Sequence, residues 1–449
     1  MNERELALDI FLEANKTGRF ATDLLRDVLN KYDYEAAGKK AFLKRLVEGT
    51  MERRIHLDWT IGCYVNVPAG KMKPLIRELL RLGTYQILYM EVPDSAACNE
   101  AVKLAKKRGF SSLSGFVNGV LRSIARNKEK IPLPDPRKDP LTAMSVRYNL
   151  PAWILRMWIA QYGEERTEKL GEGCALIRPV TIRFGEKISP KQVEETVKKM
   201  RLSGIECRKH PLHAKAYELD AHEGVASLPG FAQGLFYVQD VSSMLAVEAA
   251  GIDSGMQVLD LCAAPGGKAV FACEKAGSGR VKAGDISEAK AEKIRENARR
   301  MGCDNMEVAI RDAQEFWPDL EGWADVVLAD LPCSGLGVMG RKKEIRYRLQ
   351  PDDLPKLACL QRKILDASWR YVKPGGILLY STCTVNREEN EETVRYLTEN
   401  FPFETESLDA YLPDCLHSGQ TAEGMLQLFC AEWGTDGFFM ARLRRKHGI

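Results

Sequence analysis

Two cysteines stand out in this sequence because each one closes a short apolar run. Cys333 ends the run ADVVLADLPC, and Cys383 ends the run GGILLYSTC. If both runs are β-strands, the two thiols lie at strand ends and could face one pocket. A thiolate in such a place is a nucleophile, and its pKa depends on burial and on nearby charge. The chain has 12 cysteines, whose ordinary role is core packing, so the context has to distinguish this pair.

The stretch LDLCAAPGGKA follows a third apolar run. Glycines directly after a buried strand let the backbone approach a ligand, and an acidic residue about 20 positions later can bind ribose hydroxyls. Asp285 stands at that distance from Gly266. The stretch lacks the GxGxxG pattern of dinucleotide sites, and Lys268 is followed by Ala269 rather than the Ser or Thr of a Walker loop. These features disfavour nicotinamide cofactors and ATP, and they favour S-adenosylmethionine, a nucleoside cofactor without a pyrophosphate.

Aspartates close two further apolar runs. Asp312 in IRDA could accept a hydrogen bond from an adenine amino group, and Asp330 in ADLPC could lie where the sulfonium and the substrate meet. Either one could instead be a helix N-cap, but polar residues at four successive strand ends favour a ligand site. The predicted cofactor-binding residues are Cys262, Ala263, Ala264, Pro265, Gly266, Gly267, Lys268, Asp285, Asp312 and Asp330.

The elements that must position these residues lie in the last part of the chain, residues 236–449. Short apolar runs alternate there with helix-length amphipathic segments such as SEAKAEKIRENARRMG. Repeated βα units predict a mostly parallel sheet covered by helices on both faces, which is a Rossmann-like α/β core. Ligands of such sheets bind at the carboxyl ends of the strands, where the candidate residues fall.

Two other regions precede this core. Residues 1–135 show helical spacing, as at Leu43, Leu46 and Val47, and predict an all-α domain. The proline-rich stretch IPLPDPRKDP reads as a linker. Residues 136–235 combine helix-like PAWILRMWIAQYG and SPKQVEETVKKMRLSG with strand-like PVTIRF and YEL, which predicts a small α+β module.

Composition narrows the class of protein. No apolar run approaches about 18 residues, and the first residues are charged and amphipathic, so we expect a cytoplasmic protein without a membrane segment. The absence of any CxxC pair gives no support for a metal site. The net charge of +3 does not by itself indicate a nucleic-acid binder. Three basic runs, 103–110, 122–130 and 340–348, are either solvated faces or phosphate contacts.

Several motifs together carry a resemblance to a known family. YVQDVSS, LDLCAAPGGK, DLPCSGLGV, YSTCTVNREENE and DGFFMARL resemble the RNA cytosine-5 methyltransferases of the Sun/Fmu family. The helical N-terminal region is similar to the NusB-like RNA-binding domain of the bacterial branch that modifies small-subunit ribosomal RNA. The sequence departs from the family pattern at Leu331, where Ala is usual, and at Ala269, where Thr is common. Both departures leave the chemically required groups in place.

The resemblance implies methylation of carbon 5 of a cytosine in 16S ribosomal RNA, with S-adenosylmethionine as the methyl donor. Cys383 would be the nucleophile that adds to carbon 6, and Cys333 would assist release of the covalent intermediate. Asp330 would stabilise charge at the ring nitrogen and amino group. The basic residue that the family often places after the ribose-binding acid is Lys290. Because a Pro-Cys cysteine is the attacking residue in DNA cytosine methyltransferases, the reverse assignment of the thiols stays open.

The resemblance also predicts the organisation and the partners of the protein. The domains would be 1–135, a NusB-like RNA-binding domain; 136–235, the small module and linker; and 236–449, the methyltransferase domain. The partner would be 16S ribosomal RNA, bound by a monomer that needs no metal ion, with the basic runs on phosphates and Arg341 beside the substrate cleft. Three alternatives remain: a catalytically silent RNA-binding or assembly factor, a methyltransferase that acts on tRNA, and a DNA methyltransferase.

Overall fold

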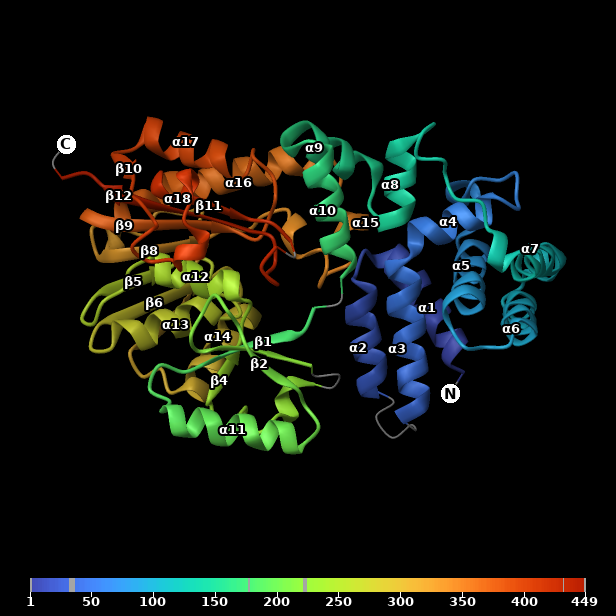
Figure 1. Ribbon diagram of the computed structural model, residues 1–449, viewed down its shortest axis with the longest axis horizontal. Helices are drawn as coiled ribbons and strands as arrows, with labels where there is room; N and C mark the ends of the chain where they lie inside the picture. The colour runs from blue at the N-terminus through green and yellow to red at the C-terminus, as the bar shows by residue number, and fades with distance from the viewer. Residues whose placement is uncertain (1, 32–36, 177, 221–223, 431, 448–449) are drawn as a thin grey trace. The chain divides into compact units, whose positions relative to one another are not determined.

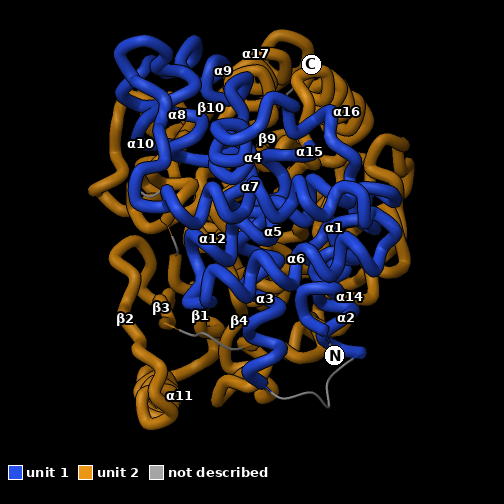
Figure 2. The backbone as a smooth tube through the Cα atoms, turned by 90° about the vertical axis from the view of Figure 1, so that its right-hand side faces the viewer, with its two compact units in different colours: residues 1–171, 342–348 blue, residues 172–341, 349–449 orange. Residues whose placement is uncertain are grey.

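The computed structural model describes residues 2–31, 37–176, 178–220, 224–430 and 432–447. The chain divides into two compact units (Figure 2). The first unit comprises residues 1–171 and 342–348, and the second comprises residues 172–341 and 349–449. Every strand among the described residues lies in the second unit.

The first unit confirms the predicted helical N-terminal domain. The helices within residues 3–126 pack around two apolar clusters, one of which contains Leu43, Leu46 and Val47 at full burial. Pro74 occupies the first turn of its helix, where a missing N–H costs nothing. None of the helices in the described ranges is long and apolar enough to cross a bilayer. The helices are α1 (Glu3–Thr17), α2 (Ala21–Lys31), α3 (Ala37–Glu52), α4 (Arg54–Gly62), α5 (Pro74–Tyr89), α6 (Asp94–Lys107), α7 (Ser114–Arg126), α8 (Pro140–Tyr148), α9 (Ala152–Tyr162), α10 (Glu164–Ala175), which extends past Gly171, and α15 (Ile345–Arg348).

The third basic run contributes residues 342–348 to the first unit. Glu344 accepts hydrogen bonds from the backbone N–H groups of Ala21 and Thr22, at 2.7 and 3.1 Å, and so caps the start of α2. Arg346 is 1% exposed, and its guanidinium donates to the carbonyl of Asn149 at 3.2 Å. The prediction that this run contacts phosphates is therefore wrong for Arg346, because its guanidinium is buried and bonds a backbone carbonyl inside the unit.

The second unit is built on a sheet of eight strands among the described residues (Figure 1). The strand order is β10-β12-β9-β8-β5-β6-β7, with β11 paired to β12. Pairs among β5 to β9 are parallel, whereas β12 runs antiparallel to β9, β10 and β11. The predicted mostly parallel, Rossmann-like sheet is confirmed. The strands are β5 (Gln257–Asp260), β6 (Arg280–Asp285), β7 (Met306–Ile310), β8 (Ala324–Asp330), β9 (Val372–Thr382), β10 (Phe403–Thr405), β11 (Met425–Leu428) and β12 (Phe438–Arg445).

Helices cover both faces of this sheet (Figure 1). Successive strand residues point to opposite faces, so Val326 and Leu328 join one apolar cluster while Val327 and Ala329 join the other. The first cluster is completed by α12 (Val241–Ala249), α13 (Gly267–Ala276) and α14 (Glu288–Met301), and the second by α16 (Asp353–Ser368) and α17 (Glu391–Asn400). A short helix, α18 (Gly419–Ala422), precedes β11. Buried on both faces, these strands appear in the sequence as continuous apolar runs.

A small α+β arrangement lies in the second unit, but the helix-like PAWILRMWIAQYG, which was predicted to belong to the same module, is α9 of the first unit. The antiparallel sheet of this α+β module has the order β2-β3-β1-β4, and its helix begins with a capping box formed by Ser189 and Gln192. Phe184 and Phe236 are fully buried between the sheet and the helix. The elements are β1 (Val180–Phe184), α11 (Pro190–Leu202), β2 (Cys207–Lys209), β3 (Ala216–Leu219) and β4 (Phe236–Val238).

Candidate active site

The carboxyl ends of β5, β6, β8 and β9 meet at one edge of the large sheet, because these strands are parallel neighbours. Three of these strands end in or beside candidate residues from the sequence. Asp285 is the last residue of β6, and Asp330 is the last residue of β8. Asp330 lies in register with Ser381 of β9, whose hydroxyl donates to the Asp330 carboxylate at 3.0 Å. The predicted meeting of strand ends is therefore present.

The two thiols lie together at this edge. The Sγ atoms of Cys333 and Cys383 are 3.4 Å apart. The hydrogen bond to Cys383, together with burial, raises the pKa of the Cys333 thiol well above its ordinary value. Cys333 therefore keeps its proton, and its S–H can stabilise a thiolate on Cys383.

A buried ion pair stands next to the thiols. The Nζ atom of Lys268 lies 2.6 Å from a carboxylate oxygen of Asp330. Burial opposes the charge of Lys268, but the neighbouring Asp330 outweighs burial, and the pKa of Lys268 is raised. The side chain of Lys268 is 11% exposed, whereas that of Asp330 is 29% exposed. Lys268 thus stays charged, and the carboxylate of Asp330 is the partner that remains partly accessible from solvent.

The glycine loop connects β5 to α13 and is tied to the end of β6. Gly266 has φ +107°, a left-handed conformation that favours glycine, and α13 starts at the next residue. Asp285 accepts a hydrogen bond from the N–H of Ala264 at 3.0 Å and pairs with Lys290 at 2.9 Å. Asp285 is 5% exposed, so its carboxylate is held against the loop rather than in open solvent.

A cavity of about 190 Å³ opens between this loop and β4. Seven of its lining residues were predicted from the sequence as cofactor ligands: Cys262, Ala263, Ala264, Pro265, Gly267, Lys268 and Asp330. Six others were not predicted: Tyr237, Val238, Gln239, Asp240, Ser243 and Asp260. Three predicted residues, Gly266, Asp285 and Asp312, are outside this lining. Asp312 follows β7 and accepts hydrogen bonds from the backbone and side chain of Gln314, at 2.9 and 3.3 Å.

Comparison with known proteins finds similarity along nearly the whole chain. The family model of the 16S rRNA methyltransferase RsmB/F matches residues 250–444, and the model of the NusB family matches residues 1–126. A probable ribosomal RNA small subunit methyltransferase B from Bacillus subtilis is 35% identical, over 99% of this chain and 98% of the relative. A ribosomal RNA small subunit methyltransferase B from Cronobacter sakazakii is 32% identical, over 99% of each chain. The crystal structure of PH0851 superposes with a TM-score of 0.80 at 25% identity, over 99% of each chain.

The chain belongs to the family of ribosomal RNA small subunit methyltransferase B.

Two of the unpredicted residues of this RsmB/F-family chain have unsatisfied polar atoms at the cavity. Neither carboxylate oxygen of Asp260, nor the amide nitrogen of Gln239, makes a well-formed hydrogen bond with the described part of the chain. Burial raises the pKa of Asp260 to about 7, although the Lys268 ammonium and the Cys262 N–H act in the opposite direction. Gln239 belongs to the motif YVQDVSS, which carried the resemblance, but no role was predicted for Gln239 itself.

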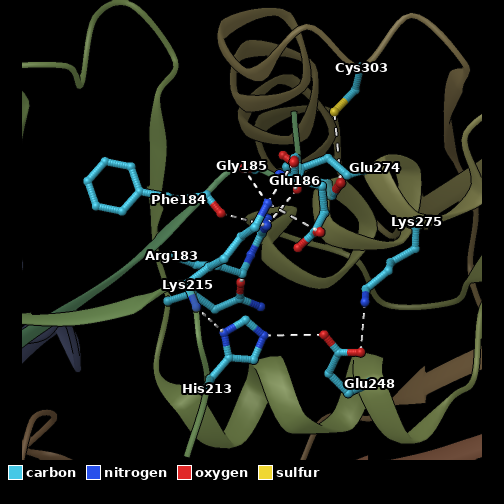
Figure 3. A network of polar contacts seen from close by, with 12 residues as sticks. Arg183, Phe184, Gly185, Glu186, His213, Lys215, Glu248, Glu274, Lys275 and Cys303 are labelled. Atoms are coloured by element: carbon cyan, nitrogen blue, oxygen red, sulfur yellow. Dashed lines mark hydrogen bonds and ion pairs between the residues drawn. The ribbon is translucent and has the colours of Figure 1, made fainter. Parts of the chain in front are cut away.

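A buried network attaches the small α+β module to helices α12 and α13 of the RsmB/F core (Figure 3). Arg183 of β1 is 0% exposed, donates to Glu274 of α13 at 2.5 Å, and lies 3.9 Å from the ring centroid of Phe271. A second contact joins His213 to Glu248 of α12 at 3.2 Å. Since β4 pairs with β1, the same network fixes the strand that contains Tyr237 and is followed directly by Gln239, both of which line the cavity.

One member of the third basic run reaches the cavity lining within the second unit. Arg341 donates to Asp240 at 3.2 Å and to Asp436 at 3.1 Å. Asp240 lines the cavity and also caps α12 through the N–H of Ser242 at 3.0 Å. Arg341 therefore contacts one residue of the cavity lining, and two carboxylates already neutralise its charge. Its place beside the substrate cleft stays a prediction.

Proposed function

We propose that this chain methylates carbon 5 of a cytosine in 16S ribosomal RNA through a covalent enzyme–base intermediate, with Cys383 as the nucleophile and Cys333 as the release residue. Membership of the RsmB/F family makes the chain an S-adenosylmethionine-dependent rRNA methyltransferase. The observation that supports the residue roles is the 3.4 Å separation of two thiols at neighbouring strand ends. A single nucleophile would need no second thiol at this distance.

The cavity residues fit S-adenosylmethionine by chemical type. The amino acid end of this cofactor carries an ammonium and a carboxylate, and the unsatisfied atoms of Asp260 and Gln239 are an acceptor and a donor. Asp285 is a charged acceptor suited to ribose hydroxyls, and Asp312 is an acceptor suited to the adenine amino group. When bound, S-adenosylmethionine supplies the methyl group from its sulfonium.

The protein's own groups account for activation of the base. Carbon 5 of cytosine is a poor nucleophile, so the Cys383 thiolate first forms a bond to carbon 6, which moves electron density onto carbon 5. The Sγ atom of Cys383 lies 3.4 Å from that of Cys333, and the attack itself requires only the Cys383 thiolate. Asp330, oriented by Lys268 and Ser381, stabilises charge at the ring nitrogen and amino group. The base must be unstacked for this attack.

Release reverses the first step. The proton on carbon 5 passes to a water molecule, its electron pair re-forms the double bond between carbons 5 and 6, and Cys383 departs as a thiolate. A thiolate leaves more easily when a donor stabilises it, and the retained S–H of Cys333 is such a donor. The 3.4 Å contact between the two Sγ atoms places Cys333 where it can assist this departure.

We assign RNA binding to the NusB-like region, within the three-part organisation of residues 1–135, 136–235 and 236–449. Arg122 and Arg126 lie one helical turn apart on the exposed face of α7, and this spacing suits successive phosphates. In the first basic run, by contrast, Lys107 and Arg108 pair with Glu5 at 2.7 and 3.0 Å. The proposal takes the enzyme to act as a cytoplasmic monomer without a metal ion.

Methyl transfer tests the proposal directly. The chain is incubated with labelled S-adenosylmethionine and, in separate reactions, with unmodified 16S rRNA, total tRNA and duplex DNA. We expect label in 16S rRNA, at a single cytosine that bisulfite sequencing locates. Label only in tRNA or only in DNA would show that this nucleic acid, and not 16S rRNA, is the substrate. RNA binding without any label would identify a catalytically silent binding protein.

A further inference from the structure

A buried carboxylate behind the two thiols has no part in the proposed chemistry. Glu389 lies between β9 and α17, in the acidic segment NREENEE, and is 0% exposed. Burial raises its pKa. Such a residue is costly to the fold unless hydrogen bonds satisfy it, so its partners indicate why it is retained.

Four donors converge on this carboxylate. The backbone N–H and the hydroxyl of Ser334 donate to it at 2.9 and 2.5 Å. The side-chain amides of Gln361 and Asn386 donate at 3.0 Å each. All four groups are donors, so the Glu389 carboxylate is the acceptor in every one of these hydrogen bonds.

The same bonds hold the residues on both sides of Cys333. Ser334, which follows Cys333, is bonded to Glu389 directly. Pro332, which precedes it, is bonded through Gln361, whose amide nitrogen also lies 3.0 Å from the Pro332 carbonyl. Cys333 is therefore held between two backbone positions that share one buried anchor.

The anchor extends to the loop of the second thiol. The Ser334 hydroxyl lies 2.6 Å from the hydroxyl of Thr384, the residue after Cys383. Since Ser334 donates its proton to Glu389, Thr384 must donate to Ser334, and Thr384 in turn accepts from the N–H of Leu336 at 3.3 Å. The Thr384 hydroxyl thus donates to the Ser334 hydroxyl, which donates to the Glu389 carboxylate, so the loop after Cys383 is also bonded to the buried carboxylate.

We propose that Glu389 is a positioning residue that holds Cys333 within hydrogen-bond distance of Cys383 and thereby sets the rate of product release. The inference rests on the proposed roles of the two thiols. It goes beyond them because it gives the acidic segment a defined task. The charge of Glu389 also contributes to the raised pKa of Cys333, after the hydrogen bond to Cys383 and burial.

The variant Glu389→Gln keeps the size of the side chain but places an amide donor among the four donors. Glu392→Gln is the matched control, because that carboxylate belongs to the same segment and pairs with Arg395 at 2.9 Å. Each protein is mixed with substrate RNA and S-adenosylmethionine. We measure methyl transfer in the first turnover, the steady-state rate, and the RNA adduct that survives denaturation.

For Glu389→Gln we expect first-turnover transfer close to wild type, a methylated adduct that accumulates, and a steady-state rate lower by roughly 10-fold to 100-fold, the effect of a small displacement of a reacting group. A second readout is the pH profile of iodoacetamide labelling at Cys333, which should shift to lower pH in this variant. A general loss of packing would lower both rates together and leave no adduct.

Release by Glu389→Gln as fast as by Glu392→Gln, with an unshifted labelling profile, would overturn the proposal. If Glu389→Gln does not fold, Ser334→Ala is the deciding variant. It removes the hydroxyl that bonds Thr384 and keeps the backbone N–H bond to Glu389. Accumulation of the adduct in Ser334→Ala supports the proposal, and release at the wild-type rate contradicts it. Cys333→Ala is run alongside. If Cys333→Ala itself accumulates no adduct, the assigned thiol roles have failed, independently of Glu389.

Discussion

Asp260 provides a test in which stability and cofactor affinity should move in opposite directions. The residue ends β5, is 1% exposed, and burial raises its pKa to about 7. We expect Asp260→Asn to stabilise the unliganded protein near neutral pH, because a buried charge is removed. The same change should weaken S-adenosylmethionine binding, because the cavity loses a charged acceptor.

Proton linkage gives the size of the stability effect. A rise in pKa from 3.8 to about 7 costs the folded state about 4 kcal/mol once the carboxyl group is ionised. The folded state holds this proton more tightly than the unfolded chain does. The stabilisation is therefore complete at low pH and is lost as the pH rises to about 7. Between pH 5 and 7 the wild type should lose about 2–3 kcal/mol relative to Asp260→Asn.

Urea unfolding of both proteins at several pH values measures this difference, and other titrating groups cancel in it. We expect the difference in free energy of unfolding to grow by about 1.4 kcal/mol for each pH unit up to about pH 7 and then to level off. Calorimetry at pH 8 should show S-adenosylmethionine affinity roughly 10-fold to 150-fold lower in the variant. A difference that does not vary with pH would refute the buried titration, and unchanged affinity would remove Asp260 from the site.

Three further predictions concern other parts of the chain. Asp285→Ala should weaken S-adenosylmethionine binding by roughly 10-fold to 150-fold in calorimetry, and Asp285→Asn, which keeps an acceptor for the loop N–H, should lose less; equal affinity in all three proteins would exclude the ribose contact. Changing Arg122 and Arg126 together to Gln should lower RNA affinity and reduce the slope of log affinity against log salt by about 1.5, whereas an unchanged slope would place RNA elsewhere. Glu344→Ala, which removes bonds of 2.7 and 3.1 Å at the start of α2, should destabilise the first unit by about 1–3 kcal/mol in denaturant unfolding, and no change would show that this cap is dispensable.

The sequence predicted the parallel sheet and the strand-end residues because both signals are local. Each strand is an apolar run, and Asp285, Asp330, Cys333 and Cys383 stand where a run stops. Chain connectivity then brings these ends to one edge. Signals of this kind can be recognised without knowledge of tertiary contacts.

Other features depend on partners that are distant in sequence. β4 has three residues, too few for a periodic pattern, so Gln239 was not assigned to the cavity. Arg346 lies in a run that looks solvated, yet its partner Asn149 is 197 residues away. Arg183 is buried because Glu274 and Phe271 of α13 compensate its charge. Only the folded chain shows these pairings.

Covalent trapping on RNA is the measurement that tests the two-thiol chemistry most directly. Cys383→Ala and Cys333→Ala are first shown to be folded and to bind S-adenosylmethionine. Each is then mixed with unmodified 16S rRNA and separated on a denaturing gel. We expect Cys383→Ala to give no adduct and no methylation, because no bond to carbon 6 forms. Cys333→Ala should accumulate a methylated adduct, because attack proceeds and release stalls. An adduct with Cys383→Ala and none with Cys333→Ala would contradict the assignment and make Cys333 the nucleophile.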